Sequence, residues 1–305
     1  MFELTFLGTA ASTPLPKRGL SSVVVSRDDY RFMVDCGEGT QRQLLSSGLG
    51  FRRLEHILLT HAHLDHYYGL GGILSTLAQW EASEGLRVYG GNAVLDRVED
   101  LINRIVFRGQ RPPIKIELIT VKPGPVLADD EFEVVAFPVR HRGPDCFGYL
   151  FQEKSRRPFL NERATELGVP NGPERRDLVR GQDITLADGR VIHAADVLGP
   201  LQRGTKLLLT GDCAETESLV RLARDADLIV TEATYLDADR ELARTYGHLT
   251  AGDAARFARD AGAQALALTH ISGRNSSKEI LDEAQAIFPA ATVVRDFDTV
   301  KVRAA

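Results

Sequence analysis

Cysteine is scarce in this sequence, and long hydrophobic runs are missing. Three cysteines, Cys36, Cys146 and Cys213, occur among 305 residues, and none belongs to a Cys-x-x-Cys pair. A sparse, odd-numbered set argues against a disulfide framework and a cysteine zinc site, and it favours a reducing compartment. No apolar run approaches the roughly 18 residues of a membrane span, and the first residues lack the pattern of a signal peptide. We therefore expect a cytoplasmic protein that does not interact with membranes.

A surplus of positive charge is also missing. The chain has 37 Lys and Arg against 42 Asp and Glu, a net charge of −5. Any contact with nucleic acid must therefore come from a local basic patch or a bound metal rather than from bulk charge. Hydrophobic residues at 43% and charged residues at 26% are typical of a globular protein with a sizeable core. This composition excludes disordered, collagen-like and coiled-coil classes.

Short apolar segments alternate with amphipathic ones in two parts of the chain, before residue 155 and after residue 204. Similar strand–helix content in both parts predicts a single α/β domain over residues 1–305, an αββα sandwich with one half from each part. Residues 155–204 are rich in Arg, Gly and Pro, and we interpret them as an arm inserted into the domain rather than as part of a sheet. The expected helices are 39–48, 67–80, 250–262 and 276–288.

The densest group of chemically active side chains is His61-Ala62-His63-Leu64-Asp65-His66, directly after the apolar segment 56–60. A strand end is rigid, so the loop that leaves it can turn several side chains toward one point. The motif offers three imidazoles and one carboxylate. Nitrogen and oxygen ligands without thiolate suit zinc, manganese or iron in a hydrolytic site. The motif therefore predicts a metal centre rather than a surface cluster of histidines.

Three further candidate ligands follow apolar segments elsewhere in the chain. His141 ends the segment FPVRH, Asp212 ends LLLTGD, and His270 ends ALALTH. Strand ends can gather ligands along one edge of a sheet, so we expect these side chains to join the His61–His66 loop. Two other histidines are not expected to bind metal. His56 lies within its strand and is expected in the core or at an edge, and His193 is expected to be solvated.

These seven residues resemble the signature of the metallo-β-lactamase fold superfamily, in which His-x-His-x-Asp-His is followed by a later His, Asp and His. The resemblance implies an αββα sandwich with its metal site at one edge. It also implies two Zn2+ ions per subunit, with Mn2+ or Fe2+ as substitutes. One zinc would be bound by His61, His63 and His141, the second by Asp65, His66 and His270, and Asp212 would bridge the two.

Other segments are similar to ribonuclease Z, the family of endonucleases that remove 3′ trailers from tRNA precursors. The opening FLGTAASTPLPKRGLSS and the segment VDCGEGTQRQLL resemble the start of that family. TEATYLD, YGHLT and LTHISGR resemble three of its motifs. Residues 167–173 and 178–192 resemble the arm that clamps the tRNA elbow. The arm is the most diagnostic part, because lactamases and glyoxalases of this fold lack it.

The resemblance implies precursor tRNA as the partner and a zinc-dependent hydrolytic mechanism. A metal-bound hydroxide would attack the phosphorus, with Asp65 both ligating metal and orienting or deprotonating the nucleophile. His248 would protonate the leaving 3′-oxygen, and Glu232 would hold its ring and raise its pKa. A homodimer in which each arm serves the partner's active site is also implied. The candidate substrate-binding residues are Arg18, Arg274, Arg175, Arg176 and Arg180.

Some positions depart from the family pattern. Gly19 follows Arg18 where the family has Asn, Thr231 stands in place of a His, and Asn275 in place of a Tyr. Residues 154–181 carry only seven basic against four acidic side chains, so the arm could instead be a solvated dimer contact. Three alternatives therefore stay open: a small-molecule phosphodiesterase, a hydrolase of lactones, thioesters or sulfate esters, and an RNA-binding protein with a relict site.

Overall fold

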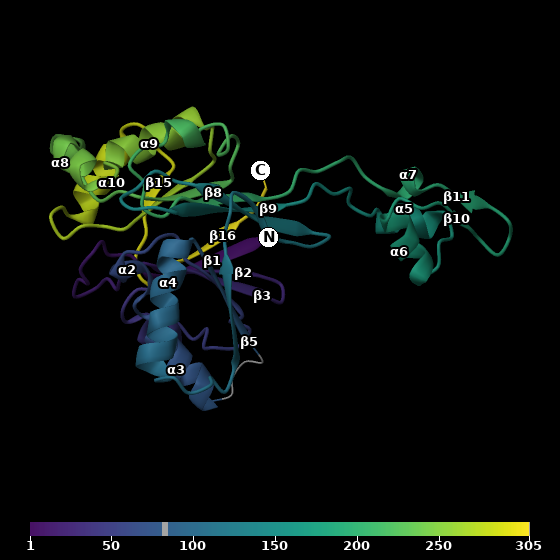
Figure 1. The fold of residues 1–305 in the computed structure, drawn as a ribbon. Coiled ribbons are helices and arrows are strands. Elements are labelled where there is room, and N and C mark those ends of the chain that lie inside the picture. Colours follow the sequence, from purple (N-terminus) through teal and green to yellow (C-terminus); the bar gives the residue numbers. More distant parts are fainter. Residues whose placement is uncertain (81–84, 305) are drawn as a thin grey trace. The chain divides into compact units, whose positions relative to one another are not determined.

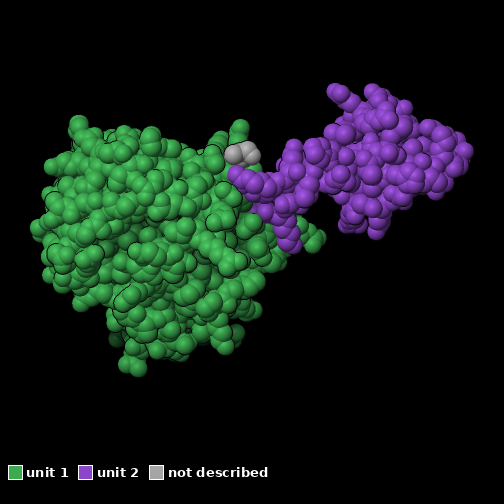
Figure 2. Space-filling model, turned by 90° about the horizontal axis from the view of Figure 1, so that it is seen from above, with its two compact units in different colours: residues 1–152, 205–305 green, residues 153–204 purple. Residues whose placement is uncertain are grey.

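The structure is a computed structural model that describes residues 1–80 and 85–304. The chain divides into two compact units, coloured separately in Figure 2. The body comprises Met1–Gln152 with Thr205–Ala305, and the insert unit comprises Glu153–Gly204. The insert unit starts near the first residue of the predicted insertion, 155–204, and ends at its last one. Helices within the described ranges are too short or too polar to cross a bilayer.

The first sheet of the body has seven strands in the order β16-β1-β2-β3-β4-β5-β6. Strands β3 to β6 run parallel to one another, so their carboxyl ends reach the same edge. The loop with the predicted metal ligands leaves β4, inside this parallel group. The strands are β1 (Phe2–Gly8), β2 (Ser22–Arg27), β3 (Tyr30–Val34), β4 (His56–Leu58), β5 (Gly85–Gly90), β6 (Lys115–Thr120) and β16 (Thr299–Val302).

The second sheet has the order β15-β14-β13-β12-β9-β8-β7. Strands β12 to β15 are parallel, and β9 pairs with β12 antiparallel. Asp212, Glu232 and His270 lie at or just beyond the carboxyl ends of β12, β13 and β14, so the parallel pairing gathers them at one edge. The strands are β7 (Gly124–Ala128), β8 (Phe132–Pro138), β9 (Phe147–Glu153), β12 (Lys206–Leu209), β13 (Leu228–Glu232), β14 (Leu266–Thr269) and β15 (Ala291–Val293).

Aromatic rings fill the space between the two sheets. Phe2 and Phe32 of the first sheet meet Phe132 and Phe151 of the second in one buried cluster. The ring centroids of Phe2 and Phe151 are 5.8 Å apart and those of Phe32 and Phe151 are 5.4 Å apart, both edge to face. Such pairs contribute about 0.5–1.5 kcal/mol each beyond the area they bury. The packing fixes the two sheets against each other, and with them the edge that carries the site.

Helices cover the outer faces of both sheets, which confirms the predicted αββα sandwich (Figure 1). Leu70, Ile73 and Leu77 of α3 pack on the first sheet, and Phe257 of α9 and Ile280 of α10 pack on the second. Helix α9 starts with a capping box between Thr250 and Asp253. The body helices are α1 (Thr40–Ser46), α2 (Leu64–Tyr67), α3 (Leu70–Trp80), α4 (Asn92–Asp100), α8 (Arg240–Tyr246), α9 (Ala251–Asp260) and α10 (Ser277–Gln285).

The structure differs from the sequence prediction in several short elements. The helix predicted over 67–80 is divided at Tyr68 and Gly69 between α2 and α3. Helices α4 and α8, the π-helical turn Leu101–Val106 and strands β7, β15 and β16 are not among the elements expected from the sequence. The three strands have three to five residues each, and their apolar alternation is too brief to distinguish them from loops. Packing against longer neighbours defines them.

The insert unit has a small core of its own. Its helices are α5 (Asn161–Glu166), α6 (Pro173–Val179) and α7 (Ala194–Val197), with a pair of two-residue strands, β10 (Ile184–Thr185) and β11 (Val191–Ile192). The segment therefore contains a minimal antiparallel ladder, where the sequence suggested none. The buried residues of the core are Ala164, Val169, Leu178, Ile192, Ala194 and Val197.

A close backbone approach locks the start of α3 onto the loop after β3. The Gly69 N–H donates to the Cys36 carbonyl at 2.9 Å, and the Cys36 N–H donates to the His66 carbonyl at 2.7 Å. A Cβ at Gly69 would lie 1.9 Å from the carbonyl oxygen of Gly37. Only glycine permits this approach, so Gly69 fixes the position of the helical turn that carries Asp65 and His66.

We predict that Gly69→Ala lowers the free energy of unfolding by about 1–3 kcal/mol or more, because the backbones must separate. Gly71→Ala is the matched control, since its Cβ would meet Leu101 Cδ1 at 3.5 Å inside helix α3. The control should be neutral or stabilised by up to about 1 kcal/mol, because alanine favours helix. Urea titrations of both variants measure the difference. Equal stability of the two variants would contradict the account.

Candidate metal centre

The loop between β4 and α3 presents four of the seven predicted ligands. His61 follows the strand end, His63 is the N-terminal cap of α2, and Asp65 and His66 lie within that short helix. The sandwich then brings His141, Asp212 and His270 to the same place from the other sheet. The structure therefore unites all seven predicted residues, although up to 209 positions separate them in the sequence.

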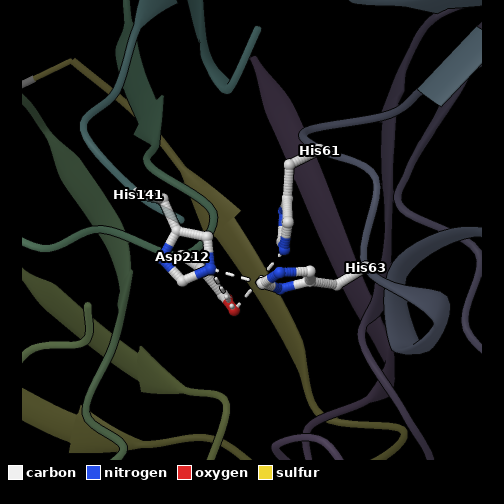
Figure 3. A group of neighbouring side chains, drawn as sticks. All are labelled: His61, His63, His141 and Asp212. Atoms are coloured by element: carbon white, nitrogen blue, oxygen red, sulfur yellow. Dashed lines mark hydrogen bonds and ion pairs between the residues drawn. The ribbon is translucent and has the colours of Figure 1, made fainter. Parts of the chain in front are cut away.

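One group of ligand atoms consists of His61, His63, His141 and Asp212, all within 4.8 Å of one another. Figure 3 shows the three imidazoles directed toward the Asp212 carboxylate. Nε2 of His61 and Nε2 of His141 each lie 3.8 Å from Asp212 Oδ2, and His141 Nε2 lies 3.3 Å from His63 Nδ1. The four side chains enclose a space suited to one cation.

A second group consists of Asp65, His66 and His270. Asp65 Oδ2 lies 3.6 Å from His66 Nε2 and 3.4 Å from His270 Nε2. Asp212 Oδ2 lies 3.4 Å from each of the same two nitrogens. One oxygen of Asp212 thus faces both groups, and this position is that of a bridging ligand.

The residues fit a pair of divalent cations. Nε2 of His61 and Nε2 of His66 are buried and have no hydrogen-bond partner among the described residues, although a buried polar atom without a partner is costly. Zinc bonds of about 2.0–2.2 Å in a tetrahedron place neighbouring ligand atoms about 3.3–3.6 Å apart, close to the distances seen here. The donors are imidazole and carboxylate, which also accept manganese and iron.

Four of the imidazoles contact an oxygen atom through Nδ1, on the side of the ring away from the cluster. These contacts determine that Nε2 faces the cluster. His141 Nδ1 lies 2.7 Å from the Gly247 carbonyl oxygen, and His66 Nδ1 lies 2.7 Å from Asp35 Oδ2. Nδ1 of His61 and of His270 lie 3.0 Å from the hydroxyls of Thr60 and Thr234. Each Nδ1–H can therefore be donated outward, which leaves Nε2 as the metal ligand.

Asp35 is a functional residue that the sequence analysis missed. It accepts hydrogen bonds from Thr60 N at 2.8 Å and from Thr60 Oγ1, besides its contact with His66. Its φ of 59° lies in the left-handed region, where non-glycine residues cost free energy. A signal was available, because Asp35 follows strand β3 directly and β3 adjoins the ligand-bearing β4. Thr234, which contacts His270 and Glu232, was missed as well.

His248 and Glu232 form a buried pair beside the cluster, as the sequence predicted. His248 Nδ1 lies 3.0 Å from both oxygens of Glu232. Glu232 also accepts from Cys213 N at 2.8 Å and from Thr234 Oγ1 at 2.5 Å, so its position is fixed. Burial lowers the pKa of His248, but the Glu232 carboxylate outweighs burial and raises this pKa to about 9. The imidazolium can therefore persist at neutral pH as a proton donor.

Most of the shifted ligand groups have pKa values that favour cation binding. Burial would raise the pKa of Asp65, but the hydrogen bond and charge of His270 and the charge of His66 hold it well below its usual range. Burial and the neighbouring His66 and His141 lower the pKa of His61 well below its usual value. Metal ligands bind as carboxylate and as neutral imidazole, and Asp65 and His61 have those forms at neutral pH. His66 differs, because the carboxylates of Asp212 and Asp35 outweigh burial and raise its pKa well above its usual value, so a cation would have to displace its proton.

An open cavity adjoins the cluster. His63, Asp65, Asp212 and His248 form part of its wall, so a substrate in it would contact the metal ligands and the proton donor together. Polar and aromatic groups surround them. The remaining lining residues are Ala11, Ser12, Thr13, Leu15, Arg142, Thr234, Tyr235, Tyr246, Ser272, Gly273 and Arg274.

Comparison with known proteins decides the family. The model of the beta-lactamase superfamily domain matches residues 30–200 and 183–271. The ribonuclease Z of Bradyrhizobium diazoefficiens is 47% identical over 302 residues, which cover 99% of this chain and all of that protein. The ribonuclease Z of Bacillus licheniformis is 40% identical, with 97% of each chain covered. The chain belongs to the ribonuclease Z family.

A solved structure agrees with this placement. The short form of human tRNase Z matches with a TM-score of 0.71 and 27% identity, over 98% of this chain and 99% of that one. The match spans nearly the whole chain, so this ribonuclease Z family member shares the overall fold of that structure and not only its metal centre. The resemblance expected from the sequence motifs is confirmed.

The five arginines predicted to bind substrate have different environments in this ribonuclease Z family member. Arg274 is exposed and lines the cavity. Arg18 is buried and donates to Thr9 Oγ1, the Val294 carbonyl and Ser277 Oγ, and it does not line the cavity. We therefore assign Arg18 to the packing of the first loop. Its role in binding substrate has no support in this geometry.

The other three arginines belong to the insert unit. Arg175 donates to Asn161, Thr165 and the carbonyls of Val169 and Pro170, so it stabilises that unit internally. Arg176 and Arg180 are exposed. The positions expected for the two remaining histidines agree with the structure. His56 is buried, with Nδ1 3.2 Å from the Tyr89 hydroxyl, and His193 is exposed and pairs with Asp183.

The positions that depart from the family pattern have local structural partners. Thr231 is buried, and its hydroxyl lies 2.7 Å from that of Thr210. The Gly19 N–H donates to Asp296 Oδ2 at 2.6 Å. Nδ2 of Asn275 is buried without a partner among the described residues. None of these three positions contributes to the lining of the cavity.

We predict that Asp35→Asn weakens metal binding by about 10- to 100-fold, as loss of an outer-sphere carboxylate does. The charge that orients His66 would be lost. Asp183→Asn is the matched control, because Asp183 also contacts a histidine Nδ1 at 2.7 Å, but in the exposed His193 pair of the insert unit. Competition with a chromogenic chelator measures both affinities. Equal affinity of Asp35→Asn and Asp183→Asn would refute the assignment.

Proposed function

We propose that this protein is a metal-dependent endoribonuclease that removes 3′ trailers from precursor tRNA. The observation that carries the proposal is the union of seven metal-ligand side chains with the His248–Glu232 pair in one open cavity. Support for the substrate comes from relatives named ribonuclease Z and from the similar structure named tRNase Z. Precursor tRNA is accordingly the proposed partner.

Two zinc ions per chain are the proposed cofactors, held by His61, His63, His141 and Asp212 and by Asp65, His66, His270 and Asp212. When bound, such a pair supplies Lewis acidity and lowers the pKa of water toward about 7. Two of the three groups of neighbouring ligand atoms together contain all seven predicted ligands, which supports this number of ions. The third group joins Asp212, His248 and His270, but Nδ1 of His248 lies closer to Glu232, at 3.0 Å, than to Asp212, at 3.8 Å. The chemistry of the donors supports zinc, with manganese or iron as substitutes.

The residues of the chain would orient the reactants and move the protons. The Ser12 N–H donates to Asp65 Oδ2 at 2.9 Å, which holds this carboxylate where it can orient and deprotonate a water. His248 would donate a proton from Nε2 to the leaving 3′-oxygen, while Glu232 accepts from Nδ1 and keeps the ring charged. Arg274, exposed at the wall of the cavity, would contact the substrate phosphate.

The insert unit is the proposed tRNA-binding arm. Arg176 and Arg180 are exposed on it and can contact backbone phosphates. We further propose a homodimer in which each arm serves the partner's active site, on the strength of the family resemblance. All three cysteines are free and buried, which agrees with a reducing compartment, and we place the protein in the cytoplasm.

We predict that His248→Ala keeps its metal but slows cleavage of precursor tRNA by about 10²–10⁴-fold, as expected for a lost acid–base group. His63→Ala is the comparison, because it removes a ligand and should lose metal and activity together. Elemental analysis and single-turnover cleavage measure both variants. Loss of metal in His248→Ala would make that residue structural. If the wild type cleaves a chromogenic phosphodiester but no precursor tRNA, the protein is a small-molecule phosphodiesterase.

A further inference from the structure

An exposed tyrosine stands next to the proposed proton donor. Tyr246 is the last residue of α8, is 44% exposed, and lines the same cavity as His248. Gly247, with φ of 72°, makes the left-handed turn between them, and its carbonyl accepts the hydrogen bond from His141. The metal ligand therefore fixes the turn, and the turn fixes Tyr246 relative to His248.

An unpaired guanidinium lies over this ring. The Cζ of Arg142 is 5.8 Å from the centroid of Tyr246, and Arg142 directly follows the ligand His141. Its guanidinium makes no hydrogen bond or ion pair with any residue in the described ranges, and the side chain is exposed at the cavity. The proposed mechanism does not use either residue.

The pair has the chemistry of a nucleotide subsite. An exposed aromatic face stacks on any nucleobase, whatever its sequence. A guanidinium without a protein acceptor can pair with a phosphate through two hydrogen bonds. The neighbouring Tyr235 cannot serve in the same way, because only 8% of it is exposed. Tyr246 thus offers an accessible ring beside the proton donor, and Arg142 offers a cation beside that ring.

We propose that Tyr246 and Arg142 bind the nucleotide that carries the leaving 3′-oxygen, with its base stacked on Tyr246 and its 5′-phosphate against Arg142. The proposal rests on the proposed function. Because His248 protonates the leaving oxygen, the nucleotide bearing that oxygen must lie against His248. Tyr246 is on the same fixed turn, so its ring meets this nucleotide rather than the one beyond the scissile phosphate. Stacking would make the subsite tolerant of the identity of the base.

The test is a double-mutant cycle between the ring and the base. Tyr246→Ala, Tyr246→Phe and wild type are assayed on a precursor tRNA that is intact or has one abasic nucleotide, placed immediately 5′ or immediately 3′ of the cleaved bond. Tyr246→Ala should raise KM on the intact RNA by about 5- to 150-fold, the range for one lost base stack. Tyr246→Phe keeps the aromatic ring, so its KM on the intact RNA should equal that of the wild type.

For the wild type, the abasic site 5′ of the bond should raise KM by the same factor as Tyr246→Ala does on intact RNA. The two changes together should raise KM no more than either change alone. The effect of the abasic site 3′ of the bond on KM should be independent of the effect of Tyr246→Ala, so that the two fold-changes multiply. Additive effects at the 5′ position, or coupling at the 3′ position instead, would overturn the proposal. Unchanged metal content and melting temperature of Tyr246→Ala exclude misfolding. Failure of wild type on intact RNA would instead refute the proposed function itself.

Discussion

One carboxylate, that of Asp212, holds the centre of this molecule together. Its Oδ2 lies 3.4–3.8 Å from Nε2 of His61, His66, His141 and His270, and only 3% of the side chain is exposed. Burial of a lone carboxylate is costly unless positive charge compensates it. Nearby His270 and His66 hold the pKa of Asp212 well below its usual range against the effect of burial. The ionised form is therefore retained, and a pair of cations would compensate it further.

The rest of the fold serves to bring ligands from two sheets to this carboxylate. Asp212 follows β12 in the second sheet, whereas His61 follows β4 in the first, so the aromatic packing between the sheets sets their separation. Two left-handed residues near the centre, Asp35 and His270, cost about 1–3 kcal/mol each. Hydrogen bonds from Thr60 to Asp35 and from His270 Nδ1 to the Thr234 hydroxyl oxygen offset this strain. The strain therefore lies at residues that orient or form the metal ligands.

The sequence indicated the seven candidate ligands because each lies at or just after the end of an apolar segment. The His248–Glu232 pair was expected from resemblance to family motifs, and the sandwich from similar strand–helix content on both sides of the insertion. Asp35 and Thr234 were missed as orienting groups. The position of Asp35 directly after β3 was a signal, but the roles of both residues arise from hydrogen bonds that only the folded chain brings together. The sequence also could not separate the buried Arg18 from the exposed Arg274, because burial depends on tertiary packing. Short edge strands such as β15 were missed for the same reason.

The most direct test of this account is a crystallographic measurement of anomalous scattering at the zinc edge, on protein reconstituted with zinc. The account predicts two peaks per chain. One should be bound by His61, His63 and His141, the other by Asp65, His66 and His270, and both should contact the carboxylate of Asp212. A single peak, or two peaks of which neither touches Asp212, would contradict it.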